Sequence, residues 1–302
     1  MIRILPLVAL LVACGEPQKA TPEAGKPAEP GRGAMIQNKG SDTLVNAAQA
    51  LAEEYRKVKP DVAIAVSGGG SGTGIAALEN GTVDIANSSR EIKAEEKDKI
   101  TAARGGAPVE HTIAYDALAV YVHKDNPITK ITKAQLAAIY GEGGTTEKWS
   151  DLGVEVPGCA DQTIVRVSRQ NNSGTYEYFR EWTLGKGDFK LGSRDMQGSK
   201  DVVDLVRSTP CAIGYSGMGY KTEDVRWVCV ALDDAAACAE PSIATVLDKS
   251  YPISRGLYMY TIGEPGGEVS RYLQWIQSDA GQAVVEKSGF VSLPADQRKP
   301  AP

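Results

Sequence analysis

Three short stretches of the chain combine glycines with small hydroxyl residues, and each stands directly before a segment with helical periodicity. They are Gly40 to Thr43, Ser67 to Gly74, and Arg169 to Thr175. A helix N-terminus presents unpaired backbone N–H groups and about half a positive charge, so it attracts anions. Serine and threonine hydroxyls donate further hydrogen bonds, and Arg169 adds a forked cationic donor. One such stretch would be an ordinary helix cap, but three predict a single small oxyanion held from several sides.

The composition is that of a globular protein with room for two domains. The chain has 302 residues, of which 42% are hydrophobic and 24% charged, close to the averages of soluble proteins. The formal net charge of −5 and the absence of a long lysine or arginine run argue against a nucleic-acid partner. An acidic protein can still bind an anion, because the donors at the site decide binding.

The N-terminal residues have the pattern of an export signal. Arg3 is a short positive region, and the apolar run from Ile4 to Ala13 is too short to span a bilayer. The run ends in Leu11-Val12-Ala13-Cys14, which is similar to the lipobox of bacterial lipoproteins. We therefore expect residues 1–13 to be a signal peptide, Cys14 to carry a lipid that anchors the protein to a membrane, and residues 14–34 to form a flexible tether. An ordinary secretory signal with an incidental cysteine is the alternative.

The number of cysteines fits an exported chain. With Cys14 assigned to lipid, Cys159, Cys211, Cys229 and Cys238 remain, an even number that favours two disulfides with three possible pairings. The short separation favours Cys229 with Cys238, which leaves Cys159 and Cys211 as the other pair. No two cysteines have the spacing of a zinc ligand pair and the chain has only two histidines, so we predict no metal site.

Strand and helix patterns alternate in the first third of the chain. Leu44, Ala48, Leu51 and Tyr55 recur with helical periodicity, and Pro60 ends that helix. The expected order is a strand at 35–38, a helix at 44–58, a strand at 61–66, a short helix at 75–80 and a strand at 83–86. Polar loops follow the carboxyl ends of these strands, which predicts an α/β fold with its ligand at that edge.

A long apolar strand at 113–122 ends this series, and the pattern then restarts. Thr132 and Gln135 form a capping box for a helix at 132–140 that stops at Gly141. A strand at 164–167 delivers Arg169 to the following loop. The remaining expected elements are helices at 174–184, 200–208, 268–277 and 280–287, and strands at 212–215 and 251–262.

In these segments the sequence resembles the phosphate-binding proteins of bacterial phosphate ABC transporters, which belong to the type II periplasmic binding protein superfamily. The resemblance extends from about Gly40 to Leu293, and the order and joint presence of its motifs make it specific. These motifs are Gly40 to Leu44, Gly72 to Ile75, Thr82 to Ala86, Ile113 to Asp116, Asp125 to Pro127, Trp149 to Gly153, Ser168 to Tyr176, Ala212 to Tyr215, Tyr251 to Arg255 and Gly289 to Val291.

The resemblance implies two α/β lobes joined by two crossover segments and closing on a ligand between them. We place one lobe at residues 35–115 plus 253–302 and the other at 116–252. It further implies a protein that is no enzyme, needs no cofactor, binds inorganic phosphate outside the inner membrane and delivers it to a cognate ABC permease. We expect a monomer, lipid-anchored in the periplasm or at the cell surface.

The phosphate contacts of the family can be carried over motif by motif. They fall on Ser41 and Thr43, on Ser71 with Gly72, on Ser89, and on Arg169, Ser173, Gly174 and Thr175. The resemblance thus implies that one lobe supplies two of the three stretches and the other lobe supplies the third.

One position departs from the family pattern. Some members have an aspartate where this chain has Ser89, and that aspartate accepts the proton of hydrogen phosphate. Sulfate near neutral pH carries no proton, so an acceptor distinguishes the two anions. Asp42 is our candidate acceptor here. If Asp42 only caps its helix, the preference for phosphate over sulfate has no such basis.

Other classes of protein receive less support from the same residues. Ile75 follows Gly74 where a P-loop has lysine, and Thr73 stands where a GxGxxG motif has its third glycine. A phosphoesterase-type hydrolase with Ser71 or Ser173 as nucleophile needs a general base, and neither histidine is near these serines in the sequence. A binding module that senses phosphate or mediates adhesion remains an alternative to transport.

Overall fold

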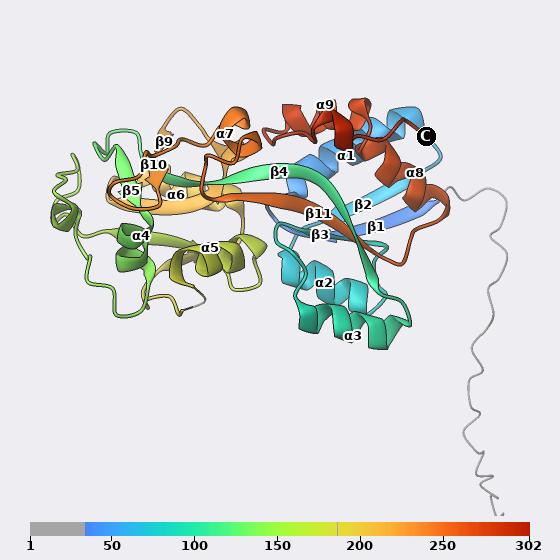
Figure 1. Cartoon of the computed structure of the whole chain (residues 1–302), viewed down its shortest axis with the longest axis horizontal. Helices are drawn as coiled ribbons and strands as arrows, with labels where there is room; N and C mark the ends of the chain where they lie inside the picture. The colour runs from blue at the N-terminus through green and yellow to red at the C-terminus, as the bar shows by residue number, and fades with distance from the viewer. Residues whose placement is uncertain (1–33, 186) are drawn as a thin grey trace, which may run out of the picture. The chain divides into compact units, whose positions relative to one another are not determined.

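A computed structural model describes residues 34–185 and 187–302 of the chain (Figure 1). These residues belong to one compact unit with a mixed α/β architecture. The predicted signal peptide, the lipidated Cys14 and nearly all of the predicted tether lie outside the described residues. Within the part of the chain that is described, no helix combines the length and the apolar character needed to cross a membrane.

The described strands form one nine-stranded sheet and a separate pair. The order in the large sheet is β2-β1-β3-β11-β4-β8-β6-β7, and β9 also pairs with β4. One group of parallel strands, which we call the β1–β3 half, consists of β1 (Met35–Gly40), β2 (Ala63–Ser67) and β3 (Ile85–Ser88). The helices of this half are α1 (Val45–Val58), α2 (Ser71–Glu79), α3 (Ala94–Arg104), α8 (Gly267–Ile276) and α9 (Asp279–Lys287).

The second group of strands, the β6–β8 half, contains the other parallel pairs. Its strands are β6 (Val165–Arg169), β7 (Arg194–Met196), β8 (Ala212–Gly217) and β9 (Val225–Trp227), beside the separate pair β5 (Lys130–Thr132) and β10 (Cys229–Ala231). Its helices are α4 (Lys133–Tyr140), α5 (Gly174–Leu184), α6 (Ser199–Ser208) and α7 (Ile243–Leu247). Short 3₁₀ turns occur at Trp149–Leu152, Met218–Tyr220 and Ala295–Gln297.

Two long antiparallel strands connect the halves, as Figure 1 shows. They are β4 (Pro108–His123) and β11 (Ser254–Ile262). The first part of β4, up to Ala117, pairs with β11, and from Leu118 on it pairs with β8 instead. The strand is therefore longer than the apolar run at 113–122 predicts, because it serves both halves of the sheet.

The hydrophobic cores divide in the same way. Two clusters of buried side chains draw on residues between 36 and 114 and between 257 and 290. Two others draw on residues between 117 and 253, with Val291 added. In the first set, Tyr55 of α1 packs its ring 5.0 Å from that of Tyr272 and 5.2 Å from that of Trp275. The amphipathic pattern of α1 thus places this helix against α8.

A buried ion pair joins the two connecting strands. Arg255 of β11 donates from Nη2 to Asp116 Oδ2 of β4 at 2.8 Å, and both side chains are almost wholly inaccessible. Asp116 also accepts from the backbone N–H of Met218, just after β8. Burial raises the pKa of Asp116, and the facing guanidinium of Arg255 opposes that shift. This pair fixes the two strands to each other where the halves meet.

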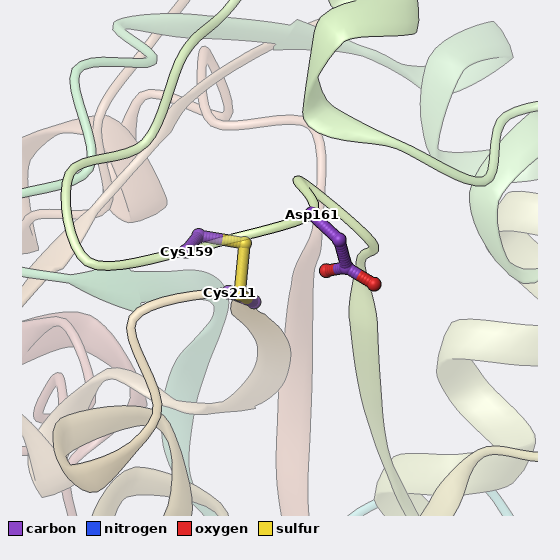
Figure 2. A group of neighbouring side chains, drawn as sticks. All are labelled: Cys159, Asp161 and Cys211. Carbon is purple, nitrogen blue, oxygen red and sulfur yellow. A yellow bond between two sulfur atoms is a disulfide. The ribbon is translucent and has the colours of Figure 1, made fainter.

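Both expected disulfides are present. Cys229 bonds to Cys238, and Cys159 bonds to Cys211 across 52 residues of sequence. Figure 2 shows the second bond with Asp161 beside it. These three residues form a group of potential metal ligands, but the two sulfurs are bonded to each other. Asp161 accepts hydrogen bonds from the backbone N–H and the hydroxyl of Thr163. We propose no metal site there.

Candidate functional site

Four helices begin where parallel strands end, and three of them, α2, α5 and α6, begin with a serine or a glycine. Helix α1 follows β1, α2 follows β2, α5 follows β6, and α6 follows β7. Helix α2 starts at Ser71, four residues before the predicted 75–80 segment, so the hydroxyl of Ser71 lies in the first turn. This arrangement directs helix N-termini from both halves of the sheet toward one place, where residues of the two halves are in contact.

Three buried serines gather at the strand ends of the β1–β3 half. Ser41 donates from its hydroxyl to Ser89 Oγ at 2.9 Å. The hydroxyls of Ser71 and Ser89 lie 3.4 Å apart, and the backbone N–H of Ser89 donates to Ser71 Oγ at 3.1 Å. None of the three is more than 2% exposed. This serine cluster (Ser41, Ser71 and Ser89) unites residues that follow three different strands.

The two halves touch directly at these residues. The hydroxyls of Thr43 and Thr175 lie 2.8 Å apart, although 132 positions separate them in sequence. The backbone N–H of Gly72 donates to the carbonyl of Asn172 at 3.1 Å, and the Asn172 side chain donates to the carbonyl of Gly69 at 2.8 Å. The glycine stretch and the start of α5 therefore meet face to face.

Gly174 has no room for a side chain. A Cβ at this position would lie 2.7 Å from Ser89 Oγ and closer still to Ser71 Oγ. Gly174 is the first residue of α5, and Ser173 caps that helix by accepting from the backbone N–H groups of Thr175 and Tyr176. The absence of a side chain lets the α5 N-terminus approach the serine cluster.

Arg169 is the fully buried cation of the site. It donates from Nη1 to Ser199 Oγ at 3.0 Å, from Nη2 to the Gln197 carbonyl at 2.6 Å, and from Nε toward the carbonyls of Met196 and Gln197. Its facing carboxylate, Asp42, is 3.8 Å away. Burial lowers the pKa of Arg169 to about 10, and Asp42 opposes this shift, so the guanidinium stays protonated at neutral pH. A buried cation with so distant a counter-charge favours an anion.

Asp42 connects the glycine stretch with Arg169. Its Oδ1 accepts from the backbone N–H of Gly69 at 2.8 Å, and its Oδ2 faces Arg169. The N-cap of α1 is Leu44, which has no side-chain cap, so Asp42 does not cap the helix that follows it. Among the described residues, no group donates a hydrogen bond to Oδ2, which lies 3.8 Å from Arg169 Nη2.

The structure brings together all the residues that the sequence predicts for the site and adds three. Ser199 contacts Arg169 and Thr43, Asn172 contacts the glycine stretch, and Tyr220 donates from its hydroxyl to the Thr43 carbonyl at 2.9 Å. Ser199 repeats the pattern of a hydroxyl at the start of a helix after a strand, so the sequence signal was available. Tyr220 gives no such signal, since only the fold brings the 3₁₀ turn near β1.

The geometry of the site and the fold together define a class of protein. Two α/β halves, linked by two strands, meet at helix N-termini and buried hydroxyls, one of which accepts from the buried Arg169. This is the fold of the type II periplasmic binding proteins.

A PBP superfamily domain matches residues 20–280. A protein from Clostridium perfringens, solved with bound phosphate and assigned to the substrate-binding proteins of phosphate ABC transporters, is 31% identical. It superposes with a TM-score of 0.74 over 86% of this chain and 100% of that one.

Two relatives identified by sequence are also phosphate-binding proteins. The phosphate-binding protein PstS of Pseudomonas aeruginosa is 38% identical over 266 residues, which cover 85% of this chain and 82% of that protein. The phosphate-binding protein PstS of Bacillus subtilis is 30% identical over 97% of this chain and 93% of that one. The chain therefore belongs to the PBP superfamily and, within it, to the family of PstS phosphate-binding proteins.

Proposed function

We propose that this protein is a solute-binding protein, without enzymatic activity, that holds inorganic phosphate between two lobes and delivers it to a cognate ABC permease. The observation that carries the proposal is the fully buried Arg169, which donates to the Ser199 hydroxyl, itself 3.4 Å from the Thr43 hydroxyl of the other half. Such a set of donors suits a small anion with several oxygens. The relatives' names support phosphate as that anion.

The proposed ligands are hydroxyls, backbone N–H groups and one guanidinium. Hydroxyls that bond to one another in this structure, such as those of Thr43 and Thr175, can rotate to donate to phosphate oxygens instead. The N-termini of α2 and α5 add backbone N–H groups and their positive dipole ends. The proposed contacts are Ser41, Thr43, Ser71, Gly72, Ser89, Arg169, Ser173, Gly174 and Thr175, with Asp42 as the acceptor.

We further propose that the two lobes comprise residues 35–115 plus 253–302 and residues 116–252. The division of the hydrophobic cores supports these boundaries. Phosphate that contacts both lobes would stabilise the closed form by the contacts it gains there. Strands β4 and β11 carry the crossovers, so they would be the hinge.

Calorimetric titration with phosphate and with sulfate, at two pH values, tests the proposed function. The purified protein should bind phosphate, bind sulfate more weakly, and show no turnover of an aryl phosphate. Saturable turnover would favour the hydrolase. In the structure, however, neither histidine is hydrogen-bonded to Ser71 or Ser173. The ring of His111 is hydrogen-bonded to the Thr261 hydroxyl, and that of His123 accepts from the backbone N–H of Asp125. Phosphate binding without a permease partner would favour the sensing or adhesion module.

Replacing Asp42 with asparagine should reduce the preference for phosphate over sulfate about tenfold. The amide oxygen can still accept from the Gly69 N–H, so the NH₂ group takes the place of Oδ2. A donor then stands where the proton of hydrogen phosphate needs an acceptor. Competition calorimetry measures the ratio of the two affinities.

Asp84→Asn is the matched control, because Asp84 also accepts a backbone N–H, that of Gln37, outside the site. It should leave the ratio unchanged. An unaltered ratio in Asp42→Asn would refute the acceptor role while leaving phosphate binding itself intact.

We also propose that the protein is exported and held at a membrane through lipid on Cys14, as a monomer. The lipobox-like Leu11-Val12-Ala13-Cys14 supports this. Cys14→Ser should release the protein from the membrane fraction of cells that express it, as immunoblots of fractionated cells would show. Retention of this variant in the membrane fraction would count against lipid anchoring.

A further inference from the structure

The hydroxyl of Ser199 is not needed by its own helix. Helix α6 begins at Ser199, and its N-cap is Gly198. Asp201 closes the first turn, because its Oδ2 accepts from the Gly198 backbone N–H at 2.9 Å. Local helix chemistry therefore does not account for a serine at position 199.

Ser199 instead points its hydroxyl into the proposed site. It is 1% exposed, its Oγ accepts from Arg169 Nη1 at 3.0 Å, and the same oxygen lies 3.4 Å from Thr43 Oγ1 in the other half. Its carbonyl accepts from the hydroxyl of Ser216 on β8 at 3.3 Å, which fixes the start of α6 to the sheet. Ser199 thus links the buried guanidinium to a hydroxyl across the interface of the halves.

The four hydrogen bonds that the guanidinium of Arg169 donates all go to one short segment, residues 196–199. Met196 and Gln197 supply carbonyls, and Ser199 supplies a hydroxyl. A carbonyl can only accept, whereas a hydroxyl that accepts from Arg169 can still donate. The Ser199 hydroxyl can therefore accept from Arg169 and at the same time donate to a group on the opposite half.

We propose that Ser199 is a positioning residue for phosphate binding, one that orients Arg169 and joins it to Thr43 when the lobes are closed. This inference rests on the proposed function. Loss of the hydroxyl would free Nη1 and remove one contact across the lobes, so the bound phosphate would leave faster. The rate of association would change little, because the charge of Arg169 remains.

Ser199→Ala tests this role, with Ser208→Ala as its control at the far end of α6. The Ser208 hydroxyl donates only to carbonyls of its own helix, those of Asp204 and Leu205. Calorimetry and stopped-flow with inorganic phosphate should show about a tenfold rise in Kd for Ser199→Ala, carried by dissociation, and no change for Ser208→Ala. Thermal unfolding without phosphate checks that both variants are folded.

A double-mutant cycle separates positioning from a merely structural role. In an Arg169→Lys background, which keeps the charge but not the fork, Ser199→Ala should have little further effect. An equal effect in both backgrounds, or an unchanged Kd in Ser199→Ala alone, would overturn the inference. If the wild-type protein does not bind phosphate, the proposed function itself fails. Normal wild-type binding with an unaffected Ser199→Ala variant refutes only the role of Ser199.

Discussion

Arg169→Ala is expected to weaken phosphate binding by at least about thirtyfold. Removing one partner of a buried, hydrogen-bonded charge pair typically costs 2–5 kcal/mol of binding free energy. Arg169 is wholly inaccessible, and its facing carboxylate Asp42 is 3.8 Å away, so much of its charge is available to an anion. Calorimetry with inorganic phosphate measures the change.

Arg166→Ala on the same strand is the control for this experiment. Arg166 pairs with Glu147, at 2.9 Å, away from the residues of the site. Its loss should lower thermal stability at most slightly and leave the phosphate Kd as it is. Near-normal affinity in a folded Arg169→Ala variant would count heavily against the proposed site.

Gly174→Ala is the second change for which we expect a large effect, and it works by steric exclusion. The added methyl group would stand where Ser71 and Ser89 now approach the α5 N-terminus, with Ser89 Oγ only 2.7 Å from the new Cβ. The start of α5 would have to retreat from the serine cluster, which would oppose closure of the proposed lobes. We expect phosphate affinity to fall at least about tenfold, as calorimetry would show, since even small misplacement at a closely packed site is costly.

Gly266→Ala provides the comparison. A Cβ at Gly266 would meet nothing within 4 Å, and its φ of −102° is open to any residue. This variant should bind phosphate normally. If Gly174→Ala does so too, the close approach of the two halves seen here is not the form that binds phosphate.

Elements with a clear apolar periodicity could be predicted from the sequence. Helix α5 has the predicted bounds, and α1 starts one residue later than expected because Leu44 serves as its N-cap. The sequence gives no comparable signal for α3 (Ala94–Arg104), in which only Ile100 is buried. Strands of three residues, such as β7 and β9, are also too short to show alternation. They exist because neighbouring strands in the sheet pair with them.

The residues of the site could be predicted from the sequence, but the contacts between them could not. The three glycine and hydroxyl stretches identify the residues, because their chemistry is local to each stretch. The contact of Thr43 with Thr175 depends on how the whole sheet is ordered, and no local pattern encodes it. The ion pair of Arg90 with Glu96, at 2.7 Å, depends on the start of α3, a helix that the apolar pattern does not predict. The sequence therefore indicates what can bind, and the fold decides which side chains face one another.

Both disulfides stabilise the same half of the molecule. All four bonded cysteines lie between residues 159 and 238, in the part that carries Arg169, and the β1–β3 half has none. In the chain-entropy account, bonds that close 52 and 9 residues stabilise the folded state by about 4 and 2.5 kcal/mol. A chain that reaches a reducing compartment would lose this support in one half only. Its arginine-bearing half would then unfold at a lower temperature than it does with both bonds intact, so a thermal melt in reductant should begin earlier than one without reductant.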